Sequence, residues 1–307
     1  ENSIFMNIET TGFTPAHSRV YLIGTAYRRD AKLIIDQFFA EREEEELAII
    51  RGFLSIEKDF KTLISFNGVG FDIPFLKAKC DHYELTENFS ELHYLDIFKS
   101  VSELKPLLHL PNYKQTTIEK YLDINREDPF SGGELINVYY GYLKNPTKGA
   151  YHTLILHNYE DLLGMADMLP ILSYLEIFPG QYAITRALEQ EHTSYDGIMS
   201  RELTIYMHND YPVPRRVFIH KKGFYFQTVG DESLIRTPIH IGELHLFYRK
   251  ESKMWGGEGA RMLEDISIRF ADDMVFFNAR TSYYDWSTSQ WKDGRLEVIF
   301  RHNADQI

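Results

Sequence analysis

The chain has 307 residues, of which 44% are apolar and 25% charged, a size and composition typical of about two ordinary globular domains. Its net charge of −12 argues against broad electrostatic wrapping of nucleic acid, where the protein contributes Lys and Arg. It does not exclude a nuclease, because catalytic carboxylates add negative charge and a local basic groove can coexist with an acidic whole.

The cysteine count and the hydropathy indicate where the protein works. The single cysteine, Cys80, excludes an internal disulfide and fits a reducing compartment. No apolar run approaches the length that spans a bilayer, and the N-terminus shows no signal-peptide pattern. We therefore expect a cytoplasmic protein with no membrane partner. Glu1 lies only a few residues before a predicted strand, so we also expect residues upstream of it.

The first predicted strand covers residues 4–9 and ends in Thr10-Thr11-Gly12. Apolar and polar positions alternate along it, so Asn7 and Glu9 lie on the same side. Two oxygen-bearing side chains at a strand end can contribute to a site for a hard divalent cation such as Mg²⁺. The alternative is a buried strand with a polar rim.

Two further strands and a helix are predicted next. Residues 19–27 and 33–39 are apolar and β-prone and are separated by a short polar turn, which predicts an antiparallel meander with the first strand. Residues 41–57 have helical spacing. The acidic run from Glu43 to Glu46 falls in the first turn, where the helix dipole favours carboxylates, and we expect it to be a solvated helix start.

A short strand at residues 62–66 is followed by Asn67-Gly68 and then by Asp72, at the point where a strand gives way to a helix. Asp72 could act in a site or simply as a helix N-cap. Residues 92–97 form another predicted strand, and we expect Asp96, near its end, to be structural. Residues 98–150 are expected to be mainly helical, most clearly at 116–122 and 133–143.

The longest predicted helix covers residues 154–177 and is closed by Pro179-Gly180. His157 and Asp161 are four residues apart within it, so they share a face. The alternative for this pair is a solvent-exposed ion pair without a catalytic role.

The remainder of the chain has a different character. Short β-prone runs at 201–207, 215–220, 223–229, 242–248, 266–270, 274–277 and 296–300 are separated by Pro, Gly and Asp turns. Residues 255–259 are a plausible flexible connection. We expect one domain at residues 1–180 and a second, β-rich domain of unknown role at 181–307.

Three motifs in order resemble the DEDD superfamily of 3′-to-5′ exonucleases, which have a ribonuclease H-like fold. Asn7-Ile8-Glu9-Thr10-Thr11-Gly12 corresponds to D-x-E-T-T-G, and Asn67-Gly68 with Phe71-Asp72 corresponds to N-G-x-x-F-D. His157-Asn158-Tyr159-Glu160-Asp161 corresponds to the histidine-type third motif H-N-x-x-D. The resemblance covers about residues 3–178. It implies an α/β fold with a mixed five-stranded sheet flanked by helices, followed here by the β-rich region.

The resemblance also implies the chemistry of the site. Two divalent ions, Mg or Mn, would clamp the attacking and leaving oxygens of an in-line displacement at phosphorus. The implied metal positions are Asn7, Glu9, Asp72 and Asp161. His157 would act as the general base, which suits an imidazole because its reference pKa is near neutral. By the same resemblance, Asn67 would position the nucleic-acid backbone and Thr10 would help to seat the terminal nucleotide.

Asn7 departs from the family pattern, in which an aspartate bridges both ions. An amide brings no charge, so we expect a weakened or inactive enzyme, either an engineered Asp-to-Asn variant or a natural pseudo-enzyme. The expected activity is 3′-to-5′ degradation of single-stranded DNA or RNA. The alternatives are a nuclease-fold module that only binds nucleic acid or a protein partner, and a structure-selective endonuclease. The sequence does not fix the oligomeric state.

The β-rich region offers a weaker candidate for nucleic-acid binding. Arg215 and Arg216 are its core, in a set of basic and aromatic residues that also contains Arg201, Lys221, Lys222, Tyr206, Tyr211 and Phe218. Such a surface can bind single strands by charge and stacking. The alternatives are a solvated hairpin face over an aromatic core, a clamp for duplex substrate, and a surface for self-association.

Overall fold

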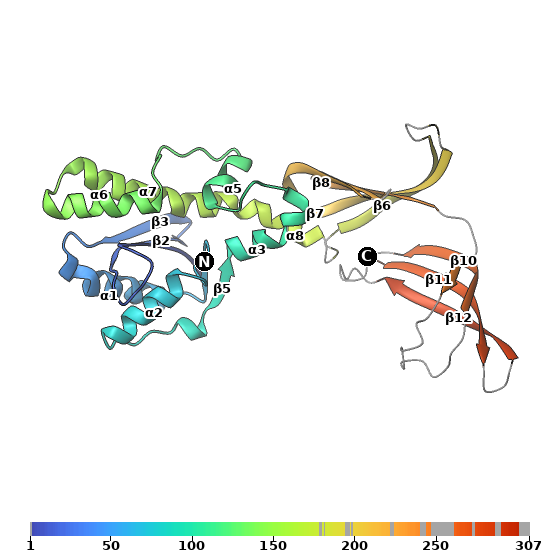
Figure 1. The fold of residues 1–307 in the computed structure, drawn as a ribbon, viewed down its shortest axis with the longest axis horizontal. Helices are drawn as coiled ribbons and strands as arrows, with labels where there is room; N and C mark the ends of the chain where they lie inside the picture. The colour runs from blue at the N-terminus through green and yellow to red at the C-terminus, as the bar shows by residue number, and fades with distance from the viewer. Residues whose placement is uncertain are drawn as a thin grey trace. The chain divides into compact units, whose positions relative to one another are not determined.

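The chain forms two compact units, Glu1–Leu172 and Ser173–Ile307 (Figure 1). The computed structural model describes residues 2–177, 180, 182–193, 197, 199–221, 224–239, 244–246, 261–271, 274–285 and 290–300, with most side chains described up to residue 239. Within these ranges, no helix combines the length and the apolar character needed to cross a bilayer. The two domains expected from the sequence, residues 1–180 and 181–307, stay a prediction.

A mixed five-stranded sheet forms the centre of the first unit, in the order β3-β2-β1-β4-β5. The strands are β1 (Ser3–Thr10), β2 (Val20–Arg29), β3 (Lys32–Phe39), β4 (Thr62–Ser65) and β5 (His93–Asp96). β1 is antiparallel to β2 and parallel to β4. The carboxyl ends of β1 and β4 therefore lie at the same edge of the sheet, and side chains that follow the two strands can meet there.

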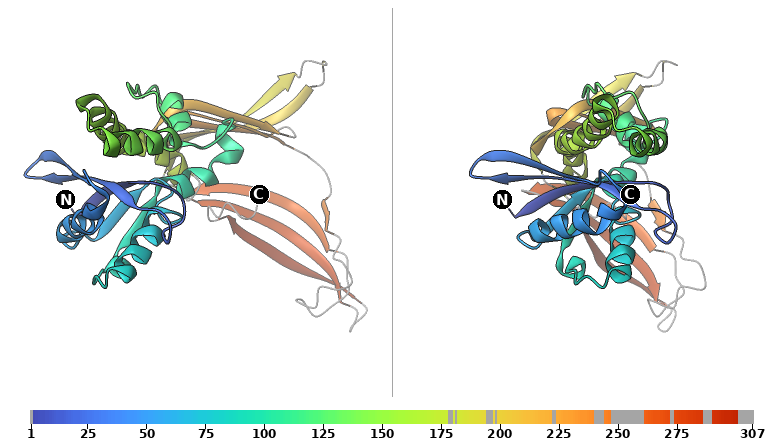
Figure 2. Two further views of the ribbon diagram at one scale, coloured as in Figure 1. Left: turned by 60° about the vertical axis from the view of Figure 1, so that its left-hand side comes forward. Right: turned by 90° about the vertical axis from the view of Figure 1, so that its left-hand side faces the viewer.

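Helices cover both faces of this sheet, with α1 and α2 on one face and α6 and α7 on the other (Figures 1 and 2). The sequence of helical elements is η1 (Glu43–Glu45), α1 (Glu46–Glu57), α2 (Asp72–His82), η2 (Phe89–Glu91), α3 (Ile97–Glu103), α4 (Lys105–Leu108), α5 (Gln115–Tyr121), α6 (Gly132–Lys144), α7 (Lys148–Met168) and η3 (Leu169–Leu172). The predicted mixed five-stranded sheet flanked by helices is confirmed.

Burial on both faces explains the composition of the central strands. The first eight residues of β2 are all buried, as is expected of a strand covered by helices on each side. Tyr21 of β2 stacks on Tyr139 of α6, with ring centroids 4.1 Å apart. On the opposite face, Ile50 and Phe53 of α1 are fully buried. These contacts fix the sheet between its helices.

Glu46 is only 1% exposed. The prediction that Glu43–Glu46 form a solvated helix start is therefore wrong for this residue. Its carboxylate accepts a hydrogen bond from Val20 N at 2.7 Å and from the Tyr83 hydroxyl at 2.6 Å, and pairs with Lys79 Nζ at 3.0 Å. A buried carboxylate is tolerated here because donors and a counter-charge surround it. Glu46 thus ties α1 to β2 and α2.

The longest helix begins earlier and ends sooner than the predicted range of 154–177. It starts at Lys148, where the Thr147 hydroxyl accepts a hydrogen bond from Ala150 N and acts as the N-cap. It ends at Met168, and the chain continues as the 3₁₀ turn η3, which contains Pro170. Proline cannot donate a helical hydrogen bond, which accounts for the break.

The second unit is β-rich, as predicted. It contains α8 (Ser173–Ile177), a three-stranded antiparallel sheet of β6 (Tyr182–Thr193), β7 (Met199–Lys221) and β8 (Phe224–Pro238), and a four-stranded sheet of β9 (Leu244–Leu246), β10 (Arg261–Ala271), β11 (Met274–Asp285) and β12 (Gln290–Phe300). The predicted runs at 201–207 and 215–220 belong to one strand, β7. Pro212 and Pro214 fall where its register against β8 shifts between His208 and Val217. The predicted flexible connection at 255–259 lies outside the described residues.

Candidate active site

The site forms at the end of β1, where Asn7 and Glu9 project to the same side of the strand. The pairing with β2 is irregular between Glu9 and Thr10, a bulge of the kind that often redirects side chains beside functional sites. Glu9 is only 7% exposed, so its carboxylate is largely removed from water. Asn7 Nδ2 donates to Glu9 Oε1 at 3.1 Å.

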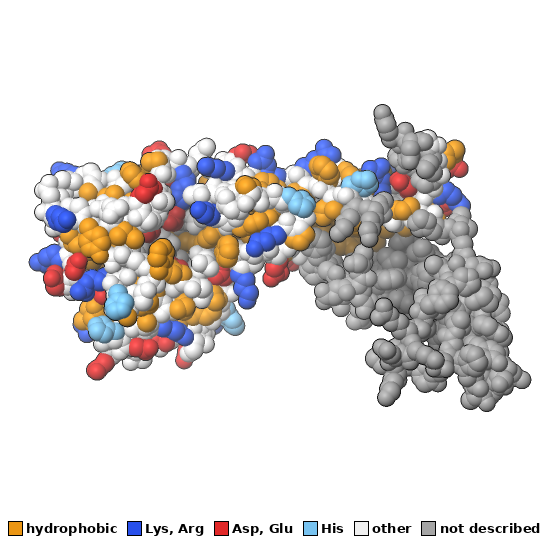
Figure 3. Space-filling view, in the orientation of Figure 1, with side chains coloured by type: hydrophobic (Ala, Val, Ile, Leu, Met, Phe, Trp, Pro, Cys, Tyr) orange, Lys and Arg blue, Asp and Glu red, His pale blue; other side chains and the backbone are white. Residues whose placement is uncertain are grey.

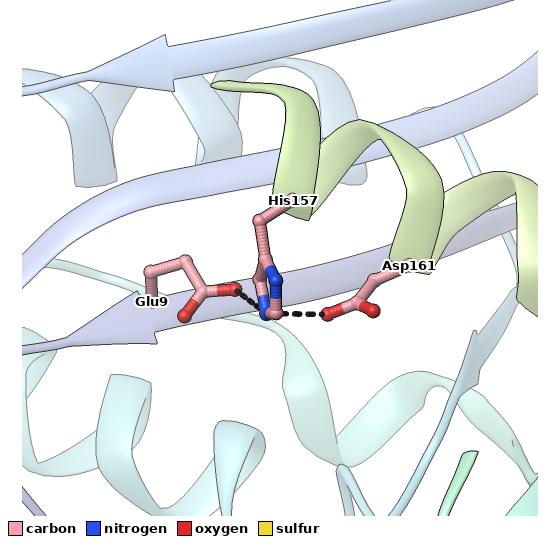
Figure 4. A group of neighbouring side chains, drawn as sticks. All are labelled: Glu9, His157 and Asp161. Carbon is pink, nitrogen blue, oxygen red and sulfur yellow. Dashed lines mark ion pairs between the residues drawn. The ribbon is translucent and has the colours of Figure 1, made fainter. Parts of the chain in front are cut away.

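Helix α7 brings His157 and Asp161 against Glu9 (Figure 4). His157 Nε2 lies 3.8 Å from Glu9 Oε1 and 3.4 Å from Asp161 Oδ2. One ligand atom from each of the three residues lies within 4.8 Å of the other two. The alternative of a solvent-exposed His–Asp pair is therefore wrong, because His157 is 7% exposed and the Asp161 side chain 15%.

The approach of α7 to the sheet depends on Asn158, the residue after His157. Asn158 is fully buried, its Nδ2 donates to Asn7 O at 3.3 Å, and its Oδ1 accepts from Gln37 Nε2 at 2.9 Å. Gly24 on β2 leaves the room for this contact: a Cβ there would lie 2.8 Å from Asn158 Cγ and closer still to Oδ1. The asparagine of the third motif thus attaches α7 to β1 and β3.

Asp72 lies at the first turn of α2 and is 5% exposed. It is not the N-cap, which is Phe71, so the N-cap alternative is wrong. Its Oδ1 instead accepts a hydrogen bond from Ile8 N at 3.1 Å, which places the carboxylate beside β1 between Asn7 and Glu9. Asp72 does not belong to the 4.8 Å group of Glu9, His157 and Asp161.

Burial and crowding of charge perturb the titration of the site. Burial, opposed by His157 and reinforced by Asp161 and Asp72, raises the pKa of Glu9 to about 8. Burial also raises the pKa of Asp72 to about 7. For His157, burial lowers the pKa, but Asp161 and the other nearby carboxylates outweigh burial and leave the pKa above its ordinary value. Perturbed groups of this kind are concentrated at functional sites.

Two residues of the site were not predicted: Arg126 and Asp128, from the segment between α5 and α6. Asp128 Oδ2 lies 2.5 Å from His157 Nδ1. Arg126 Nη1 lies 2.6 Å from Asp161 Oδ1 and 3.3 Å from Glu119 Oε1. The side chain of Arg126 is 11% exposed and that of Asp128 is 2% exposed, so both are largely buried. In the sequence the segment reads Asn125-Arg126-Glu127-Asp128-Pro129, a charged turn without periodicity.

The donor set fits a divalent cation in residue type. Carboxylate oxygens of Glu9 and Asp161, with Asp72 beside them, are the ligands that Mg²⁺ or Mn²⁺ take. Asn7 contributes differently from an aspartate, because its Nδ2 donates to both Glu9 Oε1 and Asp161 Oδ2, the latter at 3.3 Å. The amide thereby uses carboxylate lone pairs that a cation would use.

The remaining motif residues have local partners. Thr10 Oγ1 donates to Gly12 O at 2.8 Å within the turn after β1. Asn67 is exposed and has a positive φ of 62°, a conformation that asparagine tolerates. Asp96 accepts hydrogen bonds from Asn67 N and Val69 N and caps α3 through Lys99 N, which is the structural role expected of it.

Arg215 and Arg216 lie on β7 in the second unit, and both are exposed. The backbone of Arg215 bonds with the Tyr174 hydroxyl, and Arg216 Nη2 donates to Gln227 Oε1 at 2.7 Å. Phe218 is 60% exposed. Arg201 pairs with Glu189. Lys222 and the side chain of Lys221 lie outside the described residues.

The charged side chains on one face of the molecule are of both signs. In the view of Figure 3, basic and acidic side chains are interspersed over the described residues of the first unit. This face does not gather the basic side chains into a broad patch. Nucleic-acid binding on it would depend on local contacts at a site and not on wrapping.

Comparison with known families decides the assignment. Residues 4–172 match the RNase_H_2 family, described as RNase_H superfamily. The chain belongs to the RNase_H superfamily. The RNase H-like fold expected from the sequence is thereby confirmed. The uncharacterized protein YprB of Bacillus subtilis (strain 168) is 25% identical over 171 residues, which are 54% of this chain and 41% of YprB. The match spans less than half the length of that relative.

Solved structures with some similarity include two DNA-processing enzymes. The family B DNA polymerase from the hyperthermophilic archaeon Pyrobaculum calidifontis has a TM-score of 0.45 and 16% identity, over 56% of this chain and 25% of the polymerase. Escherichia coli exonuclease I in complex with a dT13 oligonucleotide has a TM-score of 0.39 and 12% identity, over 67% of this chain and 55% of the exonuclease. At these TM-scores the similarities carry no functional argument.

Proposed function

We propose that the chain carries a metal-dependent nuclease site that removes nucleotides from the 3′ end of single-stranded DNA or RNA, and that Asn7 weakens it. The observation that carries the proposal is the convergence of Glu9, His157 and Asp161 within 4.8 Å, from elements far apart in the sequence. Asp72 and Asn7 lie beside them. Membership of the RNase_H superfamily supports a nuclease. The resemblance of the three motifs to those of 3′-to-5′ exonucleases supports that direction of degradation.

Each residue has a role in this proposal. Glu9, Asp72 and Asp161 would hold Mg or Mn, two ions by the family resemblance, which when bound supply the charge that stabilises an in-line displacement at phosphorus. His157 directs Nε2 toward the carboxylates, where it can accept a proton from an attacking water. Asp128 fixes the ring through Nδ1, so the proton sits on that nitrogen and leaves Nε2 free to act as a base.

The test restores the missing carboxylate. Asn7→Asp should release mononucleotides from 3′-labelled DNA or RNA with Mn²⁺ or Mg²⁺, and EDTA should abolish the release. The control is Asn2→Asp, which adds the same charge at an exposed position directly before β1. It should leave the activity of the Asn7 chain unchanged. A lack of any gain from Asn7→Asp would refute this proposal.

A second candidate function is a binding module without turnover. It is favoured by the two hydrogen bonds from Asn7 Nδ2, which partly satisfy Glu9 and Asp161 without a cation. This candidate predicts that the chain binds an oligonucleotide but does not degrade it, even after Asn7→Asp. Fluorescence anisotropy measured alongside the degradation assay distinguishes the two candidates.

We also propose that residues 181–307 form a separate domain whose β7 strand contacts the single strand through Arg215 and Arg216. Both side chains are exposed, and the exposed ring of Phe218 lies two residues further along the strand. Reversing the charge of both arginines should weaken oligonucleotide binding about tenfold. The matched control is the double variant Arg28→Glu and Arg51→Glu, at two exposed arginines of the first unit. Unchanged binding of the double variant would remove these two arginines from the proposed function.

A further inference from the structure

Arg126 is a largely buried cation in direct contact with a candidate metal ligand. Its Nη1 lies 2.6 Å from Asp161 Oδ1, while Asp161 Oδ2 faces His157 Nε2 at 3.4 Å. The two oxygens of Asp161 therefore have different partners. One is bound by a guanidinium, and only the other faces Glu9 and His157.

The loop that carries Arg126 is held against α7 by its own backbone. Glu160, the neighbour of Asp161, accepts hydrogen bonds from Glu127 N and Asp128 N, both at 2.9 Å. Asp128 in turn contacts His157. These contacts hold the loop backbone beside α7, and the ion pairs with Asp161 and Glu119 hold the Arg126 guanidinium in the site.

An arginine guanidinium is always protonated in a protein, so Arg126 carries a fixed positive charge at this position. Its positive charge lies beside a residue that would ligate a divalent ion. Like charges a few ångströms apart in a partly buried site repel each other strongly, and water screens little of this repulsion.

We infer that Arg126 is a positioning residue that makes Asp161 a one-oxygen ligand and lowers the affinity of the site for divalent cations by its fixed charge. The inference rests on the proposed function, because it assumes that Asp161 is a metal ligand. A purely structural ion pair would not change the affinity for divalent cations in this way. Removal of the arginine frees a carboxylate oxygen and a negative charge for the ion.

The experiment measures Mn²⁺ affinity by isothermal titration calorimetry on the full chain. Arg126→Met should bind Mn²⁺ about tenfold more tightly than the unmodified chain, because a positive charge has been removed beside the ligand. Arg126→Lys keeps the charge and should stay within about threefold. Arg42→Met, which removes an exposed arginine paired with Glu45, is the control for net charge and should not change the affinity.

Each outcome decides for or against the inference. Unchanged or weaker Mn²⁺ binding by Arg126→Met overturns it. If Arg126→Met folds only with Mn²⁺ present, as judged by circular dichroism, the inference is supported, because the ion then replaces the guanidinium charge. Failure to fold in both EDTA and saturating Mn²⁺ overturns it. Absence of Mn²⁺ binding in the Asn7→Asp chain would instead refute the proposed metal site, so the two failures are distinguishable.

Discussion

Asn7→Asp should destabilise the metal-free chain, and divalent cations should restore the lost stability. The substitution removes two hydrogen bonds from Nδ2, to Glu9 Oε1 at 3.1 Å and to Asp161 Oδ2 at 3.3 Å. At this length and partial exposure we assign about 1 kcal/mol to each bond. The added carboxylate also repels Asp161, so the total cost is about 3 kcal/mol.

The loss of unfolding free energy caused by Asn7→Asp should depend on pH. Burial and the neighbouring acids Asp161 and Asp72 raise the pKa of Glu9 from its ordinary 4.5 to about 8. Because the folded chain binds more protons than the unfolded chain between these values, the free energy of unfolding falls as the pH rises through that window. The added carboxylate raises the pKa of Glu9 further, so Asn7→Asp should cost more at about pH 9 than at about pH 6.

Urea unfolding in EDTA and in Mn²⁺ tests this reasoning. Far-ultraviolet circular dichroism is the appropriate signal, because α1 to α7 lie in the first unit, whereas Trp255, Trp286 and Trp291 all lie in the second. Mn²⁺ at about 100 times its Kd should return about 2.7 kcal/mol. Equal stability of the two chains in EDTA, with no response to Mn²⁺, would contradict the geometry assigned to Asn7.

Three further substitutions test the parts that hold the site together. Asp128→Asn should lower the rate of the Asn7→Asp enzyme about 100-fold, because the site histidine loses the negative charge that fixes its tautomer and stabilises the imidazolium. An unchanged single-turnover rate would exclude that role. Gly24→Ala should cost about 3 kcal/mol of stability, since its Cβ would overlap Asn158, and melting curves that match those of the parent chain would show that the helix tolerates displacement. Glu46→Ala should lower the free energy of unfolding by about 4 kcal/mol, because it leaves the buried Lys79 unpaired. Glu44→Ala, at an exposed position, should lower it by less than about 0.5 kcal/mol. Similar losses for the two variants in urea titrations would contradict the buried pairing.

Hydrophobic periodicity predicted the individual strands and helices that carry the motifs of the first unit, whereas the mixed five-stranded sheet was expected from the family resemblance. Alternation in β1 placed Asn7 and Glu9 together, and helical spacing placed His157 with Asp161, because both periods follow directly from backbone geometry. Periodicity does not report contacts across the fold. Glu46 looked like any carboxylate in a helical first turn, since its buried lysine partner comes 33 residues later.

Arg126 and Asp128 escaped prediction for a related reason. They lie in an irregular segment, where charged residues are ordinarily solvated. Their burial results from docking on α7, which no local pattern encodes. The continuity of β7 was also missed, because prolines normally interrupt central strands, and here they coincide with register irregularities.

The separation of the site residues along the chain has a consequence for biosynthesis. Asn7 and Asp161 touch although 154 positions separate them. A nascent polypeptide that ends before Lys148 has made the sheet strands but not α7, and so lacks both the imidazole and the third acid. The cluster of Glu9, His157 and Asp161 can therefore form only after α7 has been synthesised, and it depends on contacts of long sequence separation.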